Sequence, residues 1–367
     1  MTTLLIDPDF SALPGEVSHV FESAATRSFF NHPHWYRVFA ETVAQPERRQ
    51  VRLYAAQGVA LVLAATAQPG GERSLAGLAN YYSCEHELLR APDALPGGAV
   101  ELLRGILAER PRWEALRFTA LDDPGAQALG GALRAAGLAV RRRPAFGTWY
   151  EETAGLGFAE YVAQRPSMLV NTWRRKRNKL AKAQRSAITV FDGGGTDGVE
   201  TAVAAYETVY RNSWKGQEPY PRFMPALIRA AAQLGALRLG VVEVDGVPAA
   251  AQVWIVWQGR ATIYKLAHDE RFDDLSLGTI LTMHMMEHVL ERDRPREVDL
   301  GRGDDPYKKL WLPKRRQCWD LHAANPRTLG GLRLAARFAG AEIKARLRSR
   351  GGRDMTSVGD AAVPAGR

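Results

Sequence analysis

Three apolar, β-prone segments separated by tight turns restrict the fold of this chain more than any other feature. Asp245-Gly246 and Gln258-Gly259-Arg260 are the turns, and they connect the segments Leu237–Val244, Ala249–Trp257 and Ala261–Ala267. Asp-Gly is a preferred two-residue hairpin turn because both residues tolerate positive φ. The pattern predicts an antiparallel, three-stranded unit.

An apolar helix and a short strand follow this unit and end in an unusual turn. Ser276 can cap a helix that runs from Leu277 to about Glu291, and Val298–Leu300 is a predicted strand. The next residues read Gly-Arg-Gly-Asp-Asp-Pro-Tyr-Lys, from 301 to 308. A purely structural turn would account for the glycines, for an Asp that caps a helix and for Pro306 at a first helical position. It would not account for the adjacent Tyr307 and Lys308, so we expect this segment to have a chemical role.

The first half of the chain alternates helices and strands. A hairpin at residues 51–65 precedes helices at 99–109 and 126–136, with strands at 116–121 and from Val140 onward. This alternation predicts a small α/β domain. We expect domains at residues 1–150 and 151–325, followed at 326–367 by a basic amphipathic helix and a disordered tail. A last strand is expected at Trp319–Leu321.

The positive charge of the chain is local. The net charge is +9, but residues 174–185 alone contribute seven basic residues and no acid. Residues 327–367 contribute nine basic and three acidic residues, so the rest of the chain carries −4. No DNA-binding signature accompanies the basic helix, and we expect a solvated or substrate-steering face.

Composition indicates a globular protein in a reducing compartment. The chain has 367 residues, 46% of them hydrophobic, and two distant cysteines, Cys84 and Cys318. No apolar run reaches the roughly 18 to 20 residues of a membrane span. The first residues lack a basic start and an apolar signal core. These features predict a cytoplasmic location.

The order of elements in the second half resembles the GNAT acyltransferases, and more narrowly the FemAB/CelD-like group (also called BioF-like). The matching residues are Trp173-Arg-Arg-Lys-Arg-Asn-Lys-Leu, Tyr264 with His268-Asp269, Leu277-Gly278, and the segment Asp299 to Lys308. Phe29–Phe39 looks like the entry helix of a first, similar half. The resemblance covers about Phe29 to Leu321. It implies an α/β fold of tandem GNAT-like domains with mixed, mostly antiparallel central sheets flanked by helices.

The resemblance also implies a donor site. In GNAT folds the pantetheine of acyl-CoA pairs with an open strand edge, which here lies around Leu266. The pyrophosphate lies at the N-terminus of the next helix, where free N–H groups and the helix dipole favour an anion. The predicted cofactor-binding residues, for acetyl-CoA, are Leu266, Ser276, Leu277, Gly278 and Thr279. The usual phosphate loop is degenerate, since Asp274 stands where its first glycine should be.

Acyl transfer needs a base for the acceptor and an acid for the leaving thiolate. Asp299, Asp304 or Asp305 could be the base and Tyr307 the acid, while Lys308 or Arg302 could stabilise the oxyanion. The predicted catalytic residues are Asp299, Asp305, Tyr307 and Lys308, and the predicted substrate-binding residues are Arg302, Asp304, Trp214, Tyr264 and His268. Tyr81, Tyr82 and Tyr220 could line an acceptor groove with Trp214.

The chain is therefore predicted to be an enzyme, an acyltransferase that moves an acetyl group from acetyl-CoA to an amine or hydroxyl, with a sugar of a cell-surface polysaccharide as acceptor. Two alternatives stay open. One is a FemAB-type aminoacyl transferase that takes its donor from aminoacyl-tRNA through residues 174–179. The other is a non-catalytic protein that binds a glycan or a partner protein.

Two further patterns have structural explanations of their own. His284-Met-Met-Glu-His288 matches an inverted zinc-peptidase motif, but no acidic ligand is evident on a second helix. We therefore expect no metal and assign both histidines to packing. The helix Thr328–Arg348 could dock on its own domain. It could also contact an anionic membrane peripherally through its apolar face, which consists of Leu329, Leu332, Ala336 and Ile343.

Overall fold

A single mixed sheet runs through the protein. The computed structural model describes residues 2–66, 73–183, 185–193 and 195–351. The strands follow the order β1-β2-β3-β4-β6-β13-β7-β12-β11-β10-β9-β8, and β5 pairs with β3. Their bounds are β1 Thr3–Ile6, β2 Gln50–Ala56, β3 Val59–Thr66, β4 Ser74–Gly77, β5 Leu89–Arg90, β6 Ala115–Leu121, β7 Ala139–Glu152, β8 Ser186–Phe191, β9 Leu237–Val244, β10 Val247–Trp257, β11 Arg260–His268, β12 Glu297–Asp299 and β13 Lys314–Ala324.

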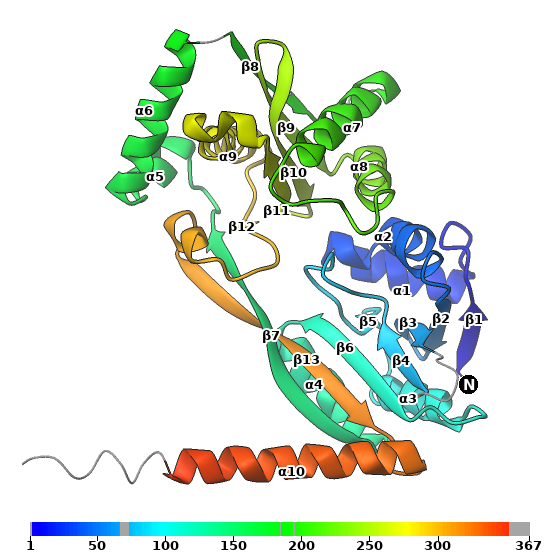
Figure 1. Cartoon of the computed structure of the whole chain (residues 1–367). Coiled ribbons are helices and arrows are strands. Elements are labelled where there is room, and N and C mark those ends of the chain that lie inside the picture. Colours follow the sequence, from blue (N-terminus) through cyan, green and yellow to red (C-terminus); the bar gives the residue numbers. More distant parts are fainter. Residues whose placement is uncertain (1, 67–72, 184, 194, 352–367) are drawn as a thin grey trace, which may run out of the picture.

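Helices cover this sheet in two lobes, which the long strands β7 and β13 connect (Figure 1). The α-helices are α1 Gly15–Ala25, α2 Pro33–Phe39, α3 Gly98–Ala108, α4 Asp123–Ala135, α5 Phe158–Ala163, α6 Ser167–Ala183, α7 Thr196–Arg211, α8 Phe223–Gln233, α9 Leu277–His288 and α10 Leu329–Gly351. Single π-helical turns extend α2 through Ala44 and α9 through Asp293. Short 3₁₀ helices lie at Phe29–Asn31, Glu270–Leu275 and Pro306–Leu310. The tail expected from Gly351 to Arg367 falls, beyond its first residue, outside the described residues.

The predicted three-stranded unit is confirmed. β9, β10 and β11 pair antiparallel in sequence order. Asp245 and Gly246 have φ angles of 52° and 80°, and Gln258 and Gly259 have 48° and 76°. The Asp-Gly turn therefore has the two positive φ angles that its sequence predicts.

The last strand differs from its prediction. A strand was expected at Trp319–Leu321, whereas β13 spans Lys314–Ala324 and lies between β6 and β7. β7 itself continues to Glu152, across the domain boundary that the sequence predicts after residue 150. Both strands are rich in charged residues, and their regularity comes from pairing with each other across about 170 residues of chain. The division of the chain into domains stays a prediction.

One hydrophobic cluster spans both lobes. Trp35 of α2 packs edge-on against Phe223 of α8, with ring centroids 5.7 Å apart. Tyr82, from the loop after β4, stacks on Phe223 at 3.9 Å. All three side chains are buried in one apolar cluster that continues into β9 and β10. This cluster holds the loop around Tyr82 against the second lobe.

Candidate active site

β11 and β12 separate where the candidate site begins. The two strands pair in parallel only from Arg260 with Glu297 to Thr262 with Asp299. β12 then ends, whereas β11 continues to His268. Gly301 lies at the point of divergence with φ +62°, and a Cβ there would lie 2.8 Å from the carbonyl oxygen of Ile263. Only glycine allows the chain to leave β12 this close to β11.

A cavity of about 390 Å³ opens at this divergence. Its walls come from β11, from the turn after β12, from the loop after α7 and from the first lobe. The lining residues are Tyr81, Tyr82, Cys84, Trp214, Lys215, Ile263, Tyr264, Lys265, Leu266, Leu300, Arg302, Asp305, Tyr307 and Lys308. The structure thus brings together seven predicted site residues: Trp214, Tyr264, Leu266, Arg302, Asp305, Tyr307 and Lys308.

Lys308 holds the turn that forms one wall of this cavity. Its side chain is buried, and Nζ donates hydrogen bonds of 3.0 to 3.2 Å to the carbonyl oxygens of Leu300, Arg302 and Gly303. Burial lowers the pKa of Lys308. Because the ammonium group of Lys308 has three donors and all three bind carbonyl oxygens of the turn, Lys308 stabilises the conformation of the turn.

Three further side chains of the turn line the cavity. Arg302 donates hydrogen bonds of 3.3 Å to the carbonyl oxygens of Asn80 and Ser83, and Tyr307 and Asp305 are the more exposed pair. Tyr307 is 45% exposed, and burial raises its pKa to about 12, so its hydroxyl keeps its proton at neutral pH. The carboxylate of Asp305 lies 3.8 Å from Nζ of Lys308, and its side chain is 60% exposed. These two residues of the turn therefore offer the cavity a proton donor and a proton acceptor.

Lys215 and Lys265 add positive charge that the sequence did not reveal. Lys215 donates a hydrogen bond to the carbonyl oxygen of Leu266, and burial together with Lys265 lowers its pKa to about 8. Lys265 forms a 3.1 Å ion pair with Glu218 and lies over the ring of Tyr82. Neither lysine belongs to a motif, and only the pairing of β11 and the path of the loop after α7 bring them here. The charged side chains of the lining are therefore mostly cationic.

Asp299 does not line this cavity. Its carboxylate accepts hydrogen bonds from Oγ1 of Thr148 at 2.5 Å and from the N–H of Gly301 at 2.7 Å. It lines a second cavity of about 220 Å³ between the lobes. Burial raises the pKa of Asp299 to about 6, against the opposing charge of Arg316. Cys84 lines both cavities, and burial raises the pKa of this free thiol to about 12.

Asp304 does not line either of these two cavities. It accepts hydrogen bonds from Arg315 of β13 and from the indole N–H of Trp149 at 2.9 Å. These bonds lower its pKa, the one from Arg315 most strongly. Asp304 therefore ties the turn to the strands that join the lobes and lies outside the cavity lining.

The predicted phosphate site lies at the start of α9. Ser276 has a left-handed backbone, and its carbonyl oxygen accepts from the N–H groups of Thr279 and Ile280. The N–H groups of the first helical residues, Leu277 and Gly278, have no partner within the helix. His268 packs against Trp214 with ring centroids 4.4 Å apart and ring planes tilted by 43°. Its Nδ1 lies 3.9 Å from where a Cβ of Gly278 would be, so His268 lies between this helix end and the cavity lining.

The two acids that precede α9 are paired. Asp273 accepts a hydrogen bond from Nε2 of His268 at 2.8 Å. Asp274 forms a 2.7 Å ion pair with Lys179 of α6 and accepts from Lys176 through its backbone carbonyl. The basic helix α6 thus lies against the loop before α9, and its lysines offset the negative charge of that loop.

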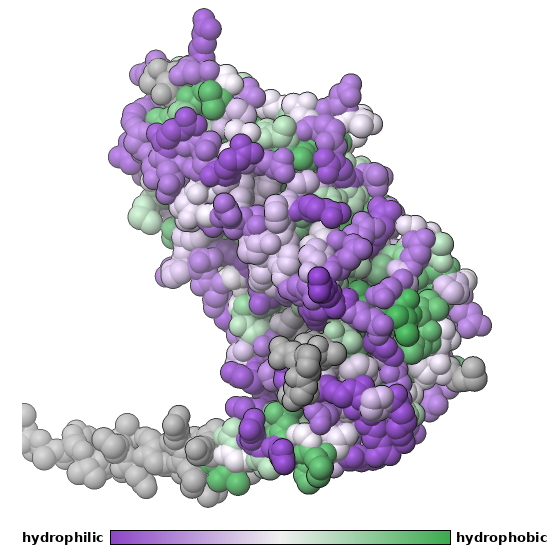
Figure 2. All heavy atoms as spheres, turned by 45° about the vertical axis from the view of Figure 1, so that its right-hand side comes forward, coloured by the Kyte–Doolittle hydropathy of each residue, from purple (hydrophilic) through white to green (hydrophobic). Residues whose placement is uncertain are grey.

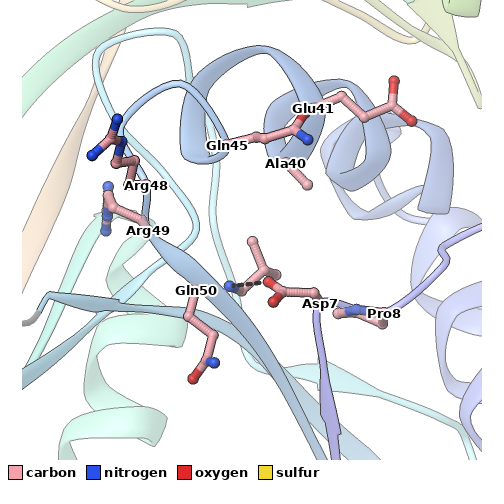
Figure 3. Close-up of a pocket in the computed structure, with 9 residues that line it drawn as sticks. Asp7, Pro8, Ala40, Glu41, Gln45, Arg48, Arg49 and Gln50 are labelled. Atoms are coloured by element: carbon pink, nitrogen blue, oxygen red, sulfur yellow. Dashed lines mark hydrogen bonds between the residues drawn. The ribbon is translucent and has the colours of Figure 1, made fainter.

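Other predicted features do not line the cavity. Tyr220 contacts the lining residue Tyr82, with ring centroids 6.0 Å apart, and donates its hydroxyl to Glu47. Among the described residues no three His, Cys, Asp or Glu side chains are grouped as metal ligands would be, and burial lowers the pKa of both His284 and His288. A cavity of about 520 Å³ in the first lobe, where the N–H of Val51 donates to Asp7, contains none of the predicted site residues (Figure 3). In the described part of the chain no helix is long and apolar enough to cross a membrane.

The sequence matches one family model and no curated protein. Residues 168–309 match the model described as an acetyltransferase (GNAT) domain. No curated protein is significantly similar to the chain. The matched segment begins in α6 and ends just after Lys308, so it contains the divergent strands, the start of α9 and the turn.

Several solved structures share the fold. A conserved protein of unknown function from Bacteroides thetaiotaomicron VPI-5482 has a TM-score of 0.56 at 10% identity, covering 89% of this chain and 100% of its own. FemX has a TM-score of 0.55 at 10% identity, covering 84% and 96%. L-PGS from Bacillus licheniformis has 0.53 at 10% identity, covering 91% and 97%. These likenesses confirm the predicted fold class.

Proposed function

We propose that this chain, whose residues 168–309 form a GNAT acetyltransferase domain, moves an acyl group from an acyl-CoA thioester to an amine or hydroxyl group. Acetyl is the proposed acyl group, and a sugar of a cell-surface polysaccharide is the proposed acceptor. The observation that carries the proposal is the cavity at the divergence of β11 and β12, whose charged side chains are mostly cationic and whose Trp214 contacts His268 near the start of α9. Tyr81 and Trp214, which are 47% and 49% exposed, provide aromatic surface there for a sugar ring.

The donor would lie along the open edge of β11. Its pantetheine amides would pair with backbone groups beyond Thr262, where β12 no longer pairs. The pyrophosphate would bind at the N-terminus of α9, near Leu277 and Gly278. Lys176 and Lys179 of α6 offset the charge of Asp274, which precedes this helix. The thioester would then reach the turn that carries Asp305 and Tyr307.

The transfer itself needs one new bond and two proton movements. The acceptor attacks the thioester carbonyl, a carbon–nitrogen or carbon–oxygen bond forms, and the carbon–sulfur bond breaks. Asp305 would take the proton from the acceptor, and Tyr307 would protonate the thiolate of CoA. Lys215 and Arg302 would stabilise the oxyanion of the intermediate. Asp299 and Lys308 would act as positioning residues, because their polar atoms hold the turn.

The first test is donor binding, which needs no acceptor. CoA and acetyl-CoA are expected to raise the Tm of the full chain. A ligand concentration of 100 times Kd adds about 2.7 kcal/mol to the free energy of unfolding. Gly278→Val should abolish the shift, because its side chain would cover the start of α9. The fold should survive, since the nearest atom to a Cβ at Gly278 is 3.9 Å away.

A matched control is Gly131→Val. Gly131 lies in α4, where a Cβ would meet nothing within 4 Å, so this variant should keep the response to CoA. The absence of any shift at millimolar CoA or acetyl-CoA would contradict the proposal. Binding of tRNA that is sensitive to salt and is lost on neutralising residues 174–179 would instead favour the aminoacyl-tRNA donor.

A further inference from the structure

Helix α10 exposes an apolar stripe on its outer face. Leu329, Leu332 and Ile343 are 78%, 54% and 59% exposed, and Ala336 is exposed with them. Spacings of three, four and seven residues put these side chains on one side of the helix. Phe338, two positions after Ala336, is buried on the opposite side, where α10 packs against β7 and β13. The stripe thus remains after the helix has docked on the protein.

Basic side chains border this stripe. Arg333 and Arg337 each follow a stripe residue by one position, and both are exposed. Residues 327–367 carry nine Lys and Arg residues but only three acids. α10 lies along the lower edge of the molecule and extends past the sheet, as Figure 1 shows. Hydrophobic and hydrophilic residues alternate at this lower edge in the space-filling view of Figure 2.

We propose that the outer face of α10 binds peripherally to the surface of an anionic lipid membrane. An amphipathic helix with basic flanks buries its apolar side chains at the level of the acyl chains while its cations contact lipid headgroups. Long Arg side chains can cover apolar surface and still keep their charge in the headgroup layer. Each basic residue near an anionic leaflet strengthens binding, so the positive charge concentrated in this part of the chain favours this partner.

A second copy of the chain is a less suitable partner for this face. A symmetric contact through α10 would bring the same patch of both molecules together, so the basic flanks would face each other. Like charges at such short range oppose association. An anionic surface instead offers opposite charge to every flank residue. Charge complementarity therefore selects the membrane.

The test is co-sedimentation of the full chain with phosphatidylcholine vesicles that either contain or lack phosphatidylglycerol. We expect binding only to the anionic vesicles, with an affinity that falls as salt rises. Leu332→Ser combined with Ile343→Ser should weaken binding at least tenfold. Arg333→Gln combined with Arg337→Gln should weaken it about thirtyfold, since each cation near the surface contributes about fivefold.

Met168→Ser is the matched control. Met168 is 63% exposed on α6, so this variant removes an exposed apolar side chain away from α10 and should leave vesicle binding unchanged. Unchanged Tm values for all variants would show that lost binding does not reflect lost folding. Equal binding to neutral and anionic vesicles, or none to either, would overturn the proposal. So would a dimer in light scattering that the Leu332 and Ile343 variant makes monomeric.

Discussion

At the residue scale, Asp299 couples the stability of the protein to pH. Its folded-state pKa is raised to about 6, mainly by burial, above the ordinary value of 3.8. The folded chain therefore binds this proton more tightly than the unfolded chain does. The resulting stabilisation is present below about pH 4 and is lost as the pH rises to about 6.

Asp299→Asn removes this dependence and keeps an acceptor for Thr148 and Gly301. We expect the unfolding free energy of the variant, relative to wild type, to increase between about pH 4 and pH 7, by up to about 3 kcal/mol. Urea unfolding of both proteins across this range is the measurement. A difference between them that does not change with pH would show that Asp299 titrates normally.

Lys215 shows the opposite sign of coupling. Burial and Lys265 lower its pKa to about 8 from 10.5, so the folded chain binds this proton more weakly than the unfolded chain. Below about pH 8 the charge on Lys215 therefore lowers the free energy of unfolding, and this destabilisation disappears above about pH 10.5. A buried, destabilising charge in a cavity is typical of a functional site.

Lys215→Met should therefore stabilise the protein near pH 7 by about 1–3 kcal/mol. The same change should slow acyl transfer, because it removes a cation from the cavity. Thermal unfolding at pH 7 and pH 10 tests the first part, and CoA release the second. A variant that is less stable than wild type at both pH values would mean that the hydrogen bond to Leu266 outweighs the buried charge.

At the scale of elements, the divergence of β11 from β12 depends on Gly301. A Cβ there would lie 2.8 Å from the carbonyl oxygen of Ile263, and the φ angle is +62°. We expect Gly301→Ala to destabilise the protein by about 1–3 kcal/mol and to weaken CoA binding, because the turn must shift.

Gly131→Ala is the control for this variant. Gly131 is inside α4, and alanine there should be neutral or stabilising by about 0.5–1 kcal/mol. Chemical unfolding and calorimetric titration with CoA measure both effects. If Gly301→Ala bound CoA as tightly as wild type, the close approach of the two strands would not shape the donor site.

At the scale of the whole molecule, β13 makes the first lobe depend on the end of the chain. β13 pairs with β6 on one side and with β7 on the other. A fragment of residues 1–150 lacks it and would expose two unpaired strand edges. We expect this fragment to aggregate or to lack cooperative unfolding, whereas the full chain unfolds cooperatively. A soluble fragment with a sharp thermal transition would contradict this expectation.

Local sequence determined much of the second half. The Asp-Gly turn and the alternation of apolar strands are short-range signals, and each predicted its element near the observed position. The helix predicted after Ser276 does begin at Leu277, although the Ser276 side chain makes no capping hydrogen bond. Seven of the predicted site residues meet in one cavity because they belong to β11, to the turn after β12 or to the loop after α7. Their proximity follows from the order of these elements, which the sequence already carries.

Contacts between distant segments decided the rest. β13 is longer than predicted because it is ordered by β6 and β7, and no local pattern records that pairing. Lys215 and Lys265 reach the cavity through the path of a loop and the register of a strand, so no motif marks them. Asp299 and Lys308 looked like catalytic groups from their residue types, but which atoms they contact depends on three-dimensional packing. Burial and the nearby charges are properties of the folded chain, and they determine the pKa and the hydrogen-bond partners of each residue.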